Sequence, residues 1–282
     1  MTARAAIPLI LLCTTACAQD LPGLLEALSH SASNFAATAP GLTADETLEQ
    51  RGRRGFLEVL KGTIVAPKQL EIRLQEGFRT HRVTSSYGLA ETGLAKVLHE
   101  IRQVTSVDGN PVTDATEARH ALSANMRGEA DRTRKILLEN FEHEQLEGAV
   151  IDFGQLILLF TERNQKNYEF SLRSPLTLAY RQVAGTHGVT VYRERGTERE
   201  TTEGEIWFSE ESLVPERITL NTERHLSKKD VIHTQANVEY KPGRLGLVPA
   251  KVVHQQFLNS SLLVENIFQY ANWQNSAPEM IP

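Results

Sequence analysis

Three segments between residues 204 and 273 establish the pattern of the chain: RITLNTE at 217–223, VIHTQANVEY at 231–240 and LLVENIFQY at 262–270. In each segment apolar side chains alternate with polar ones, which is the period of a β-strand with one face toward a core. Turn-forming residues separate the segments, among them KPG at 241–243 and NSS at 259–261. The segments therefore predict successive strands of an antiparallel sheet.

The apolar members of these strands are expected to share one face of the sheet. The alternation determines the side, since a slip of one residue would turn a strand inside out. Two interpretations of that face remain open, a solid core or the lining of an apolar cavity under a curved sheet. The candidates for a ligand cavity are Ile218, Leu220, Val238, Tyr240, Val264, Phe268 and Tyr270.

Alternation also occurs upstream, in shorter stretches. It predicts strands at 70–74, 79–87 and 97–107, while the helical spacing of apolar residues at 21–37 predicts an N-terminal helix. From Tyr168 onward every segment has strand character.

Two helical regions separate the upstream strands from the downstream ones. They cover residues 115–146 and 153–162. Strands, then helices, then strands indicate an α+β fold. We expect a strongly curved antiparallel sheet, an open or half barrel, with these helices packed on its concave face.

Two aspartates are placed to begin these helices. Asp114 precedes Glu117 by three residues, and Asp152 precedes Gln155 by three, which is the spacing of a capping box. The Asp152 carboxylate is expected to accept a hydrogen bond from the backbone N–H of Gly154 or Gln155.

The N-terminus is typical of an export signal. Arg4 is followed by an apolar stretch at 5–12 and by ACA at 16–18, a cleavage site of the A-x-A type. Residues 1–18 are predicted to be a signal peptide, and residues 19–282 a single domain that begins at Gln19. The protein would then be periplasmic or secreted; the alternative is an outer-membrane lipoprotein that carries its lipid on Cys17.

No pattern of a catalytic or metal site stands out. The nine histidines are scattered, and Glu142, His143 and Glu144 are adjacent, so on a helix they cannot all face one ion. No serine lies in a G-x-S-x-G motif. The net charge of −5 argues against a nucleic-acid partner. We therefore expect no catalytic residue, no metal, no cofactor and no nucleic acid.

Several short motifs carry a family resemblance. RVTSSYG at 82–88, HEIRQV at 99–104 and VDGNPV at 107–112 resemble a block of exported bacterial β-rich proteins, and GEIW at 204–207 with PERI at 215–218 resembles their later sheet. More distantly, this last pattern is similar to that of the periplasmic lipoprotein carriers of the Lol type. The resemblance covers roughly residues 40–275 and implies a curved, unclosed antiparallel barrel that holds acyl chains under its helices.

The sequence and this resemblance together favour one function over two others. The leading hypothesis is an exported, non-catalytic envelope protein that binds an apolar ligand, a lipid or a lipoprotein acyl chain, in a half-barrel cavity. The alternative is an envelope scaffold or interaction module with a solid core and an envelope protein as partner. A hydrolase is the third hypothesis, and it would need an acid, a base or a nucleophile converging in a cleft.

Overall fold

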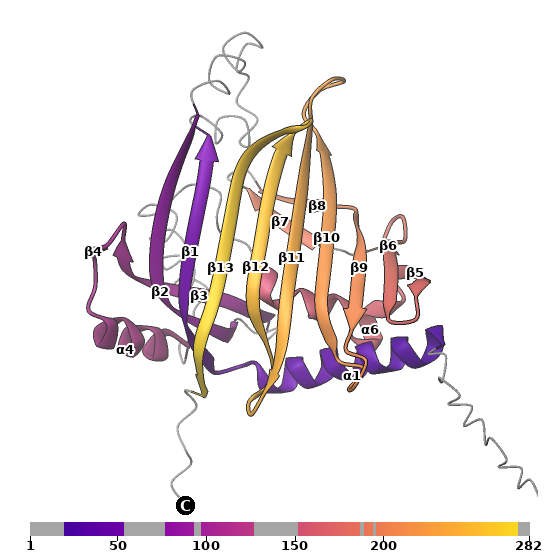
Figure 1. The fold of residues 1–282 in the computed structure, drawn as a ribbon, viewed down its shortest axis with the longest axis horizontal. Coiled ribbons are helices and arrows are strands. Elements are labelled where there is room, and N and C mark those ends of the chain that lie inside the picture. Colours follow the sequence, from indigo (N-terminus) through magenta and orange to yellow (C-terminus); the bar gives the residue numbers. More distant parts are fainter. Residues whose placement is uncertain are drawn as a thin grey trace, which may run out of the picture.

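The computed structural model describes residues 20–53, 77–92, 97–126, 152–186, 189–193 and 196–275 (Figure 1). The predicted signal peptide at 1–18, the expected new N-terminus at Gln19, the predicted strand at 70–74 and residues 127–146 of the predicted long helix lie outside these ranges. They stay predictions.

Most of the described chain forms one 11-stranded antiparallel sheet, with the strand order β4-β3-β2-β1-β13-β12-β11-β10-β9-β6-β5. Its strands are β1 (Leu42–Arg53), β2 (Phe78–Thr92), β3 (Val97–Val107), β4 (Asn110–Pro111), β5 (Tyr168–Ser174), β6 (Thr177–Gln182), β9 (Thr202–Phe208), β10 (Pro215–His225), β11 (Val231–Gly243), β12 (Gly246–Leu258) and β13 (Ser261–Asn275). Strands β7 (Val189–Arg193) and β8 (Gly196–Glu200) form a separate hairpin. The early strand β1 pairs with β13, so segments from the two ends of the chain are neighbours in the middle of the sheet.

The strand register aligns apolar residues into one continuous row. Residues directly opposite each other in antiparallel strands point to the same face. Successive partners from β6 to β2 are Leu178, Ile206, Ile218, Val238, Val252, Phe268, Leu48 and Val83. All of them are buried. We call the side of the sheet that carries this row the core face, and the opposite side the outer face.

Helical segments pack on both faces of the sheet. Helix α1 (Leu21–Thr38) begins at Asp20, whose carboxylate accepts from the N–H of Gly23 at 3.0 Å. It packs against η1 (Phe153–Phe160), a 3-10 helix, and against β12, while α6 (Glu162–Gln165) contacts both α1 and η1. Figure 1 shows α1 crossing the strands near one end of the sheet. These helical segments cover part of the core face.

Helix α4 (Ala115–Met126) lies elsewhere, against β2 and β3. Leu122 of α4 forms a small buried cluster with Ala90 and Ile101. Leu89, the neighbour of Ala90 in β2, belongs instead to the main core. Because successive strand residues point to opposite faces, α4 covers the outer face of β2 and β3. The Asp114 carboxylate accepts from the N–H groups of Thr116 and Glu117, which confirms the predicted cap of this helix.

The predicted fold class is wrong. The protein is mainly β, and its large sheet is neither closed nor strongly curled, so it is not an α+β half barrel with helices 115–146 and 153–162 on a concave face. The described start of the first helix, α4, and the second helix, η1, lie on opposite faces of the sheet. The physical reason is that a period of two assigns a residue to a face, while the curvature of a sheet depends on its twist and bulges.

Candidate functional site

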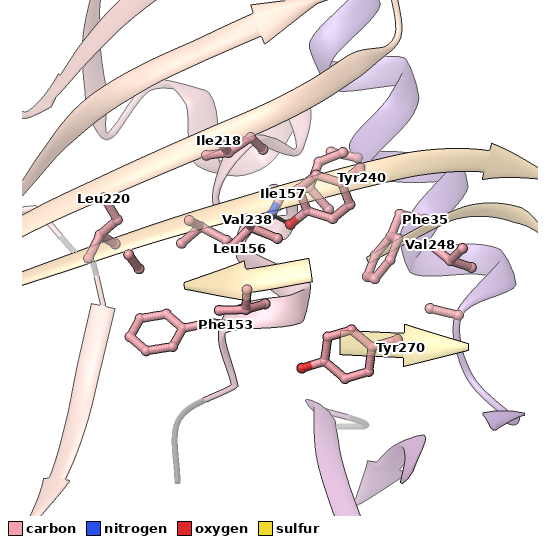
Figure 2. Packing of buried hydrophobic residues seen from close by; sticks show 14 of the residues in the cluster. Phe35, Phe153, Leu156, Ile157, Ile218, Leu220, Val238, Tyr240, Val248 and Tyr270 are labelled. Carbon is pink, nitrogen blue, oxygen red and sulfur yellow. Dashed lines mark hydrogen bonds between the residues drawn. The ribbon is translucent and has the colours of Figure 1, made fainter. Parts of the chain in front are cut away.

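The seven side chains predicted to line a ligand cavity are all buried on the core face. Six of them belong to one hydrophobic core that also contains residues of α1 and η1, and Val264 is buried outside that cluster. Figure 2 shows Tyr240 between Phe35 and Ile157. Its ring centroid lies 6.4 Å from that of Phe35, and its hydroxyl accepts from the N–H of Ile157 at 3.1 Å. The binding of a ligand by these residues stays a prediction.

A groove of about 790 Å³ lies on the other side of the sheet. Its walls and floor come from β5, β6, β9, β10, β11 and β12, mostly from residues of the outer face. None of the seven predicted residues lines it. Six neighbouring strands at about 4.8 Å spacing give the groove a length of about 24 Å across the strands.

Carboxamides form a row on the groove floor. Asn221 of β10 is directly opposite Gln235 of β11, which is directly opposite Gln255 of β12. In the adjacent row Thr219 is opposite Asn237. The Oδ1 atom of Asn237 is buried and has no hydrogen-bond partner among the residues that the structure describes. The floor therefore presents hydrogen-bonding groups at the spacing of the strands.

Charged residues at the β5–β9 end of the groove balance each other closely. Arg181 Nη2 lies 2.8 Å from a carboxylate oxygen of Glu203, and Arg173 Nε lies 3.9 Å from one of Glu205. Glu169 completes the charged residues of the lining. The lining thus carries two basic and three acidic side chains, so its net charge is close to zero.

Trp207 of β9 is the one indole of the groove lining. The guanidinium carbon of Arg217 lies 3.6 Å from its ring centroid, a cation–π contact between directly opposed residues of β9 and β10. This stacking fixes the orientation of a large, half-buried aromatic side chain at the groove.

The close packing of β9 against β10 depends on a glycine, Gly204. A Cβ atom on Gly204 would lie 2.1 Å from the carbonyl oxygen of Thr219. That carbonyl accepts a hydrogen bond from the hydroxyl of Tyr180 at 2.7 Å. Gly204 therefore allows β9 to approach β10 closely while Tyr180 reaches across to the same carbonyl.

The core face contains a buried charge cluster made of Glu46, Glu100 and Arg102. Arg102 Nε donates to both carboxylate oxygens of Glu46 at 2.9 Å, and Nη2 donates to Glu100 Oε2 at 2.7 Å. The three residues are at most 3% exposed. Burial raises the pKa of Glu100 to about 8, despite the opposing effect of Arg102.

Asp152 does not make the predicted cap. It precedes η1 as expected, but its side chain makes no capping hydrogen bond. Oδ1 accepts from the backbone N–H of Glu100 at 3.1 Å, and Oδ2 lies 3.0 Å from Nδ1 of His99. The carboxylate thus accepts from a backbone N–H of β3, as the carbonyl of a neighbouring strand would. This tertiary contact replaces the predicted capping hydrogen bond at the start of η1.

A polar ladder crosses the core face near this cluster. Gln50 Nε2 donates to Asn266 Oδ1 at 2.6 Å, and Asn266 Nδ2 donates to His254 Nδ1 at 3.0 Å. Burial lowers the pKa of His254 to about 3, so the imidazole is neutral. Because Nδ1 accepts, the proton of the ring resides on Nε2.

Neither the groove nor the charge cluster is predicted by the sequence patterns above. The groove residues are the polar residues that alternate with the apolar residues of the core face. Any sheet face that is exposed to solvent has a similar polar composition. A weak signal existed for the cluster, because Glu46 stands in phase with Leu42, Ala44 and Leu48 of β1. No group of three His, Cys, Asp or Glu side chains suited to a metal ion occurs in the described part of the chain.

Comparison with known proteins adds little to this geometry. No protein-family model matches the chain, and no curated protein matches it. A crystal structure of a DUF1329 family protein from Desulfovibrio piger aligns with 92% of this chain and 95% of its own, at 8% identity and a TM-score of 0.32. A similarity this weak assigns neither a fold family nor a function, and it does not confirm a relationship to the lipoprotein carriers. Among the helices that the structure describes, none has the length and apolar character of a membrane span.

Proposed function

We propose that this protein is a non-catalytic binding protein of the cell envelope that holds a polar ligand in the outer-face groove. The observation that carries the proposal is the contrast between the two faces. Side chains of α1 and η1 pack on part of the core face, where the seven candidate residues are buried, while the outer face of β5–β12 forms a groove of about 790 Å³ lined by amides, hydroxyls and balanced charges. The proposed location in the cell envelope rests on the N-terminus, whose sequence resembles an export signal.

The contacts on the core face count against an acyl-chain carrier. Tyr240 is held by Phe35 of α1 and by the backbone of Ile157 in η1. An acyl chain would have to displace these contacts and leave the Ile157 N–H without the phenol oxygen. Binding on the outer face requires no such opening, because the groove exists in the folded protein.

The state of the carboxylates supports a role without catalysis. Glu203 in the groove is neutralised by Arg181, and the hydrogen-bonded pair Glu100 and Arg102 is buried away from solvent. A general acid or base needs both a suitable pKa and contact with substrate. Glu100 has a raised pKa but no contact with solvent, while Glu203 and Glu205 in the groove face solvent but have charge partners of their own.

Intrinsic fluorescence provides the test. The chain has two tryptophans, and Trp273 packs near Tyr87 and Tyr270 away from the groove. In a Trp273→Phe variant, Trp207 becomes the sole reporter of the groove. Quenching by acrylamide is measured with and without oligosaccharides, hexapeptides, anionic oligosaccharides and fatty-acid micelles.

The proposal expects that one polar class of ligand shields Trp207 from acrylamide in a saturable way. Shielding by none of the polar classes would contradict it, and stoichiometric fatty-acid binding without shielding would restore the carrier hypothesis.

A further inference from the structure

We infer that the ligand of the outer-face groove is an uncharged oligosaccharide that lies across the strands. The inference rests on the proposed function and adds the chemical class of the ligand. Three features of the groove carry it: a row of carboxamides, a lining whose two arginines are both paired with carboxylates, and a fixed indole.

The carboxamide row matches the hydrogen-bonding character of a sugar. Asn221, Gln235 and Gln255 stand on three adjacent strands in direct register. A primary amide offers two donors and one acceptor oxygen, and a hydroxyl group both donates and accepts, so each amide can serve a hydroxyl in either role. Adjacent strands place these amides about 4.8 Å apart, which is close to the length of one pyranose ring in an extended polysaccharide.

Part of the row is already organised by the protein. Gln255 Nε2 donates to Glu265 Oε2 at 2.5 Å, which fixes the amide and leaves its oxygen as an acceptor. Gln235 is exposed, so both of its polar ends are accessible. Beside it, Asn237 also lines the groove, and its buried Oδ1 has no partner among the described residues.

The charges of the groove argue against an anionic ligand. Arg181 is paired with Glu203 at 2.8 Å, and Arg173 lies within 3.9 Å of Glu205. Recognition of a phosphate or carboxylate requires cationic donors that are not already neutralised. An uncharged ligand avoids repulsion from Glu169, the remaining charged residue of the lining.

Trp207 supplies the apolar part of the site. A pyranose ring has C–H groups on its faces, and such groups pack on aromatic rings that combine a large area with few rotatable bonds. Arg217 holds the indole in one orientation, so ordering this side chain on binding costs little entropy. An apolar chain would use the indole equally well, but it would bury the amide row without hydrogen bonds.

Titration of the full chain with defined sugars tests the inference. The probes are cellohexaose, maltohexaose and chitohexaose, measured by calorimetry and by the Trp207 fluorescence of the Trp273→Phe variant. We expect saturable binding of at least one probe. Asn221→Ala and Gln235→Ala should each weaken it about fivefold, the equivalent of one lost neutral hydrogen bond. Trp207→Ala, measured by calorimetry, should weaken it about tenfold or more.

A matched control separates the groove from the rest of the outer face. Gln269 of β13 is an exposed glutamine on the same face as Gln235, two strands away and outside the groove lining. Gln269→Ala should bind the sugar with unchanged affinity. Co-sedimentation with insoluble cellulose, chitin and peptidoglycan then distinguishes a polymer as the source of the glycan from a free oligosaccharide.

Each remaining outcome is decisive. If none of the three sugars binds, or if Gln235→Ala and Gln269→Ala bind equally well, the inference is overturned. Binding of a hexapeptide or an anionic oligosaccharide in place of the neutral sugars would also overturn it, while the proposed function would stand. If no polar probe of any class shields Trp207, both fail together.

Discussion

Arg102, Glu46 and Glu100 occupy positions of the core face where alternation alone leads one to expect apolar side chains. Their charges compensate one another through hydrogen bonds of 2.7–2.9 Å, and the Arg102 guanidinium also lies 5.1 Å from the ring centroid of Tyr87. Such a buried set contributes little net stability, but the loss of Arg102 or of Glu46 leaves an uncompensated charge. The alternation predicted which positions are buried. It could not predict that Glu46 of β1 would meet Arg102 of β3, because the two strands are separated in the sheet by β2 and the residues by 56 positions in the sequence.

The pH dependence of the cluster gives the first prediction, for Glu100→Gln. Burial raises the pKa of Glu100 from 4.5 in the unfolded chain to about 8 in the folded one. Below pH 4.5 both states are protonated; as pH rises toward 8 only the unfolded state ionises, so the wild type loses stability. Glutamine mimics the neutral acid, so the variant should match the wild type near pH 4.5 and exceed it by about 5 kcal/mol at pH 8.5, at about 1.4 kcal/mol per pKa unit.

Urea unfolding followed by circular dichroism at the two pH values measures this difference. Glu46→Gln is the control, because it removes the bidentate partner of Arg102. It should cost about 3–5 kcal/mol at pH 8.5. If Glu100→Gln is less stable than the wild type at pH 8.5, the pKa of Glu100 is not raised in the folded protein and the prediction is wrong.

The second prediction concerns Gly204. A Cβ atom there would meet the Thr219 carbonyl at 2.1 Å, and backbone atoms cannot move aside as a flexible side chain can. Gly204→Ala should therefore lower the free energy of unfolding by about 3 kcal/mol, at the upper end of overpacking effects. Gly243→Ala should be nearly neutral, because the nearest atom to its added Cβ is 3.7 Å away. Equal melting temperatures for the two variants would contradict the close approach of β9 and β10.

At the scale of elements, the local sequence pattern predicted whether a segment forms a helix or a strand, but not which strands lie next to each other in the sheet. The predicted helix at 21–37 is α1 (Leu21–Thr38), and the predicted strand at 97–107 is β3 with the same bounds. The position of β1 between β2 and β13 has no local signal, because pairing across more than 200 residues depends on the assembled sheet. The Asp152 side chain failed as a cap for a similar reason, since a strand edge offered it better partners.

Asp152→Ala provides a prediction at this scale. The wild-type carboxylate accepts from the N–H of Glu100 and contacts the His99 ring. Its removal should expose the Glu100 amide to faster hydrogen exchange and cost about 1–2 kcal/mol, while exchange at Gly154 and Gln155 should change little. Asp152→Asn keeps one acceptor oxygen and should retain most of the protection at Glu100. Faster exchange confined to the start of η1 would instead support the capping role.

At the scale of the molecule, the distribution of side chains between two faces was predictable, and the shape of the sheet was not. Alternation correctly put Ile218, Val238 and Phe268 on one buried face. A curved half barrel and a large open sheet have the same alternation, however, because curvature comes from twist and bulges at positions such as Asp45 in β1. The groove has no signal in the sequence for the same reason: the apolar residues that predict a cavity lie on the core face, and the groove lies on the polar outer face.

The burial of Phe268 in the apolar row changes the effect expected of Phe268→Asp. In a carrier, this substitution would abolish the uptake of a fluorescent fatty acid by a protein that stays folded. Phe268 instead lies between Leu48 and Val252 in the apolar row, is 2% exposed, and has the Arg102 guanidinium 5.3 Å from its ring centroid. Burying a carboxylate there should cost more than about 4 kcal/mol, so the variant should unfold, whereas Gln269→Asp on the exposed face should not. Circular dichroism and probe uptake by the wild type measure both properties. A folded Phe268→Asp variant that loses stoichiometric uptake shown by the wild type would establish an apolar site on the core face, and the groove would then need another role.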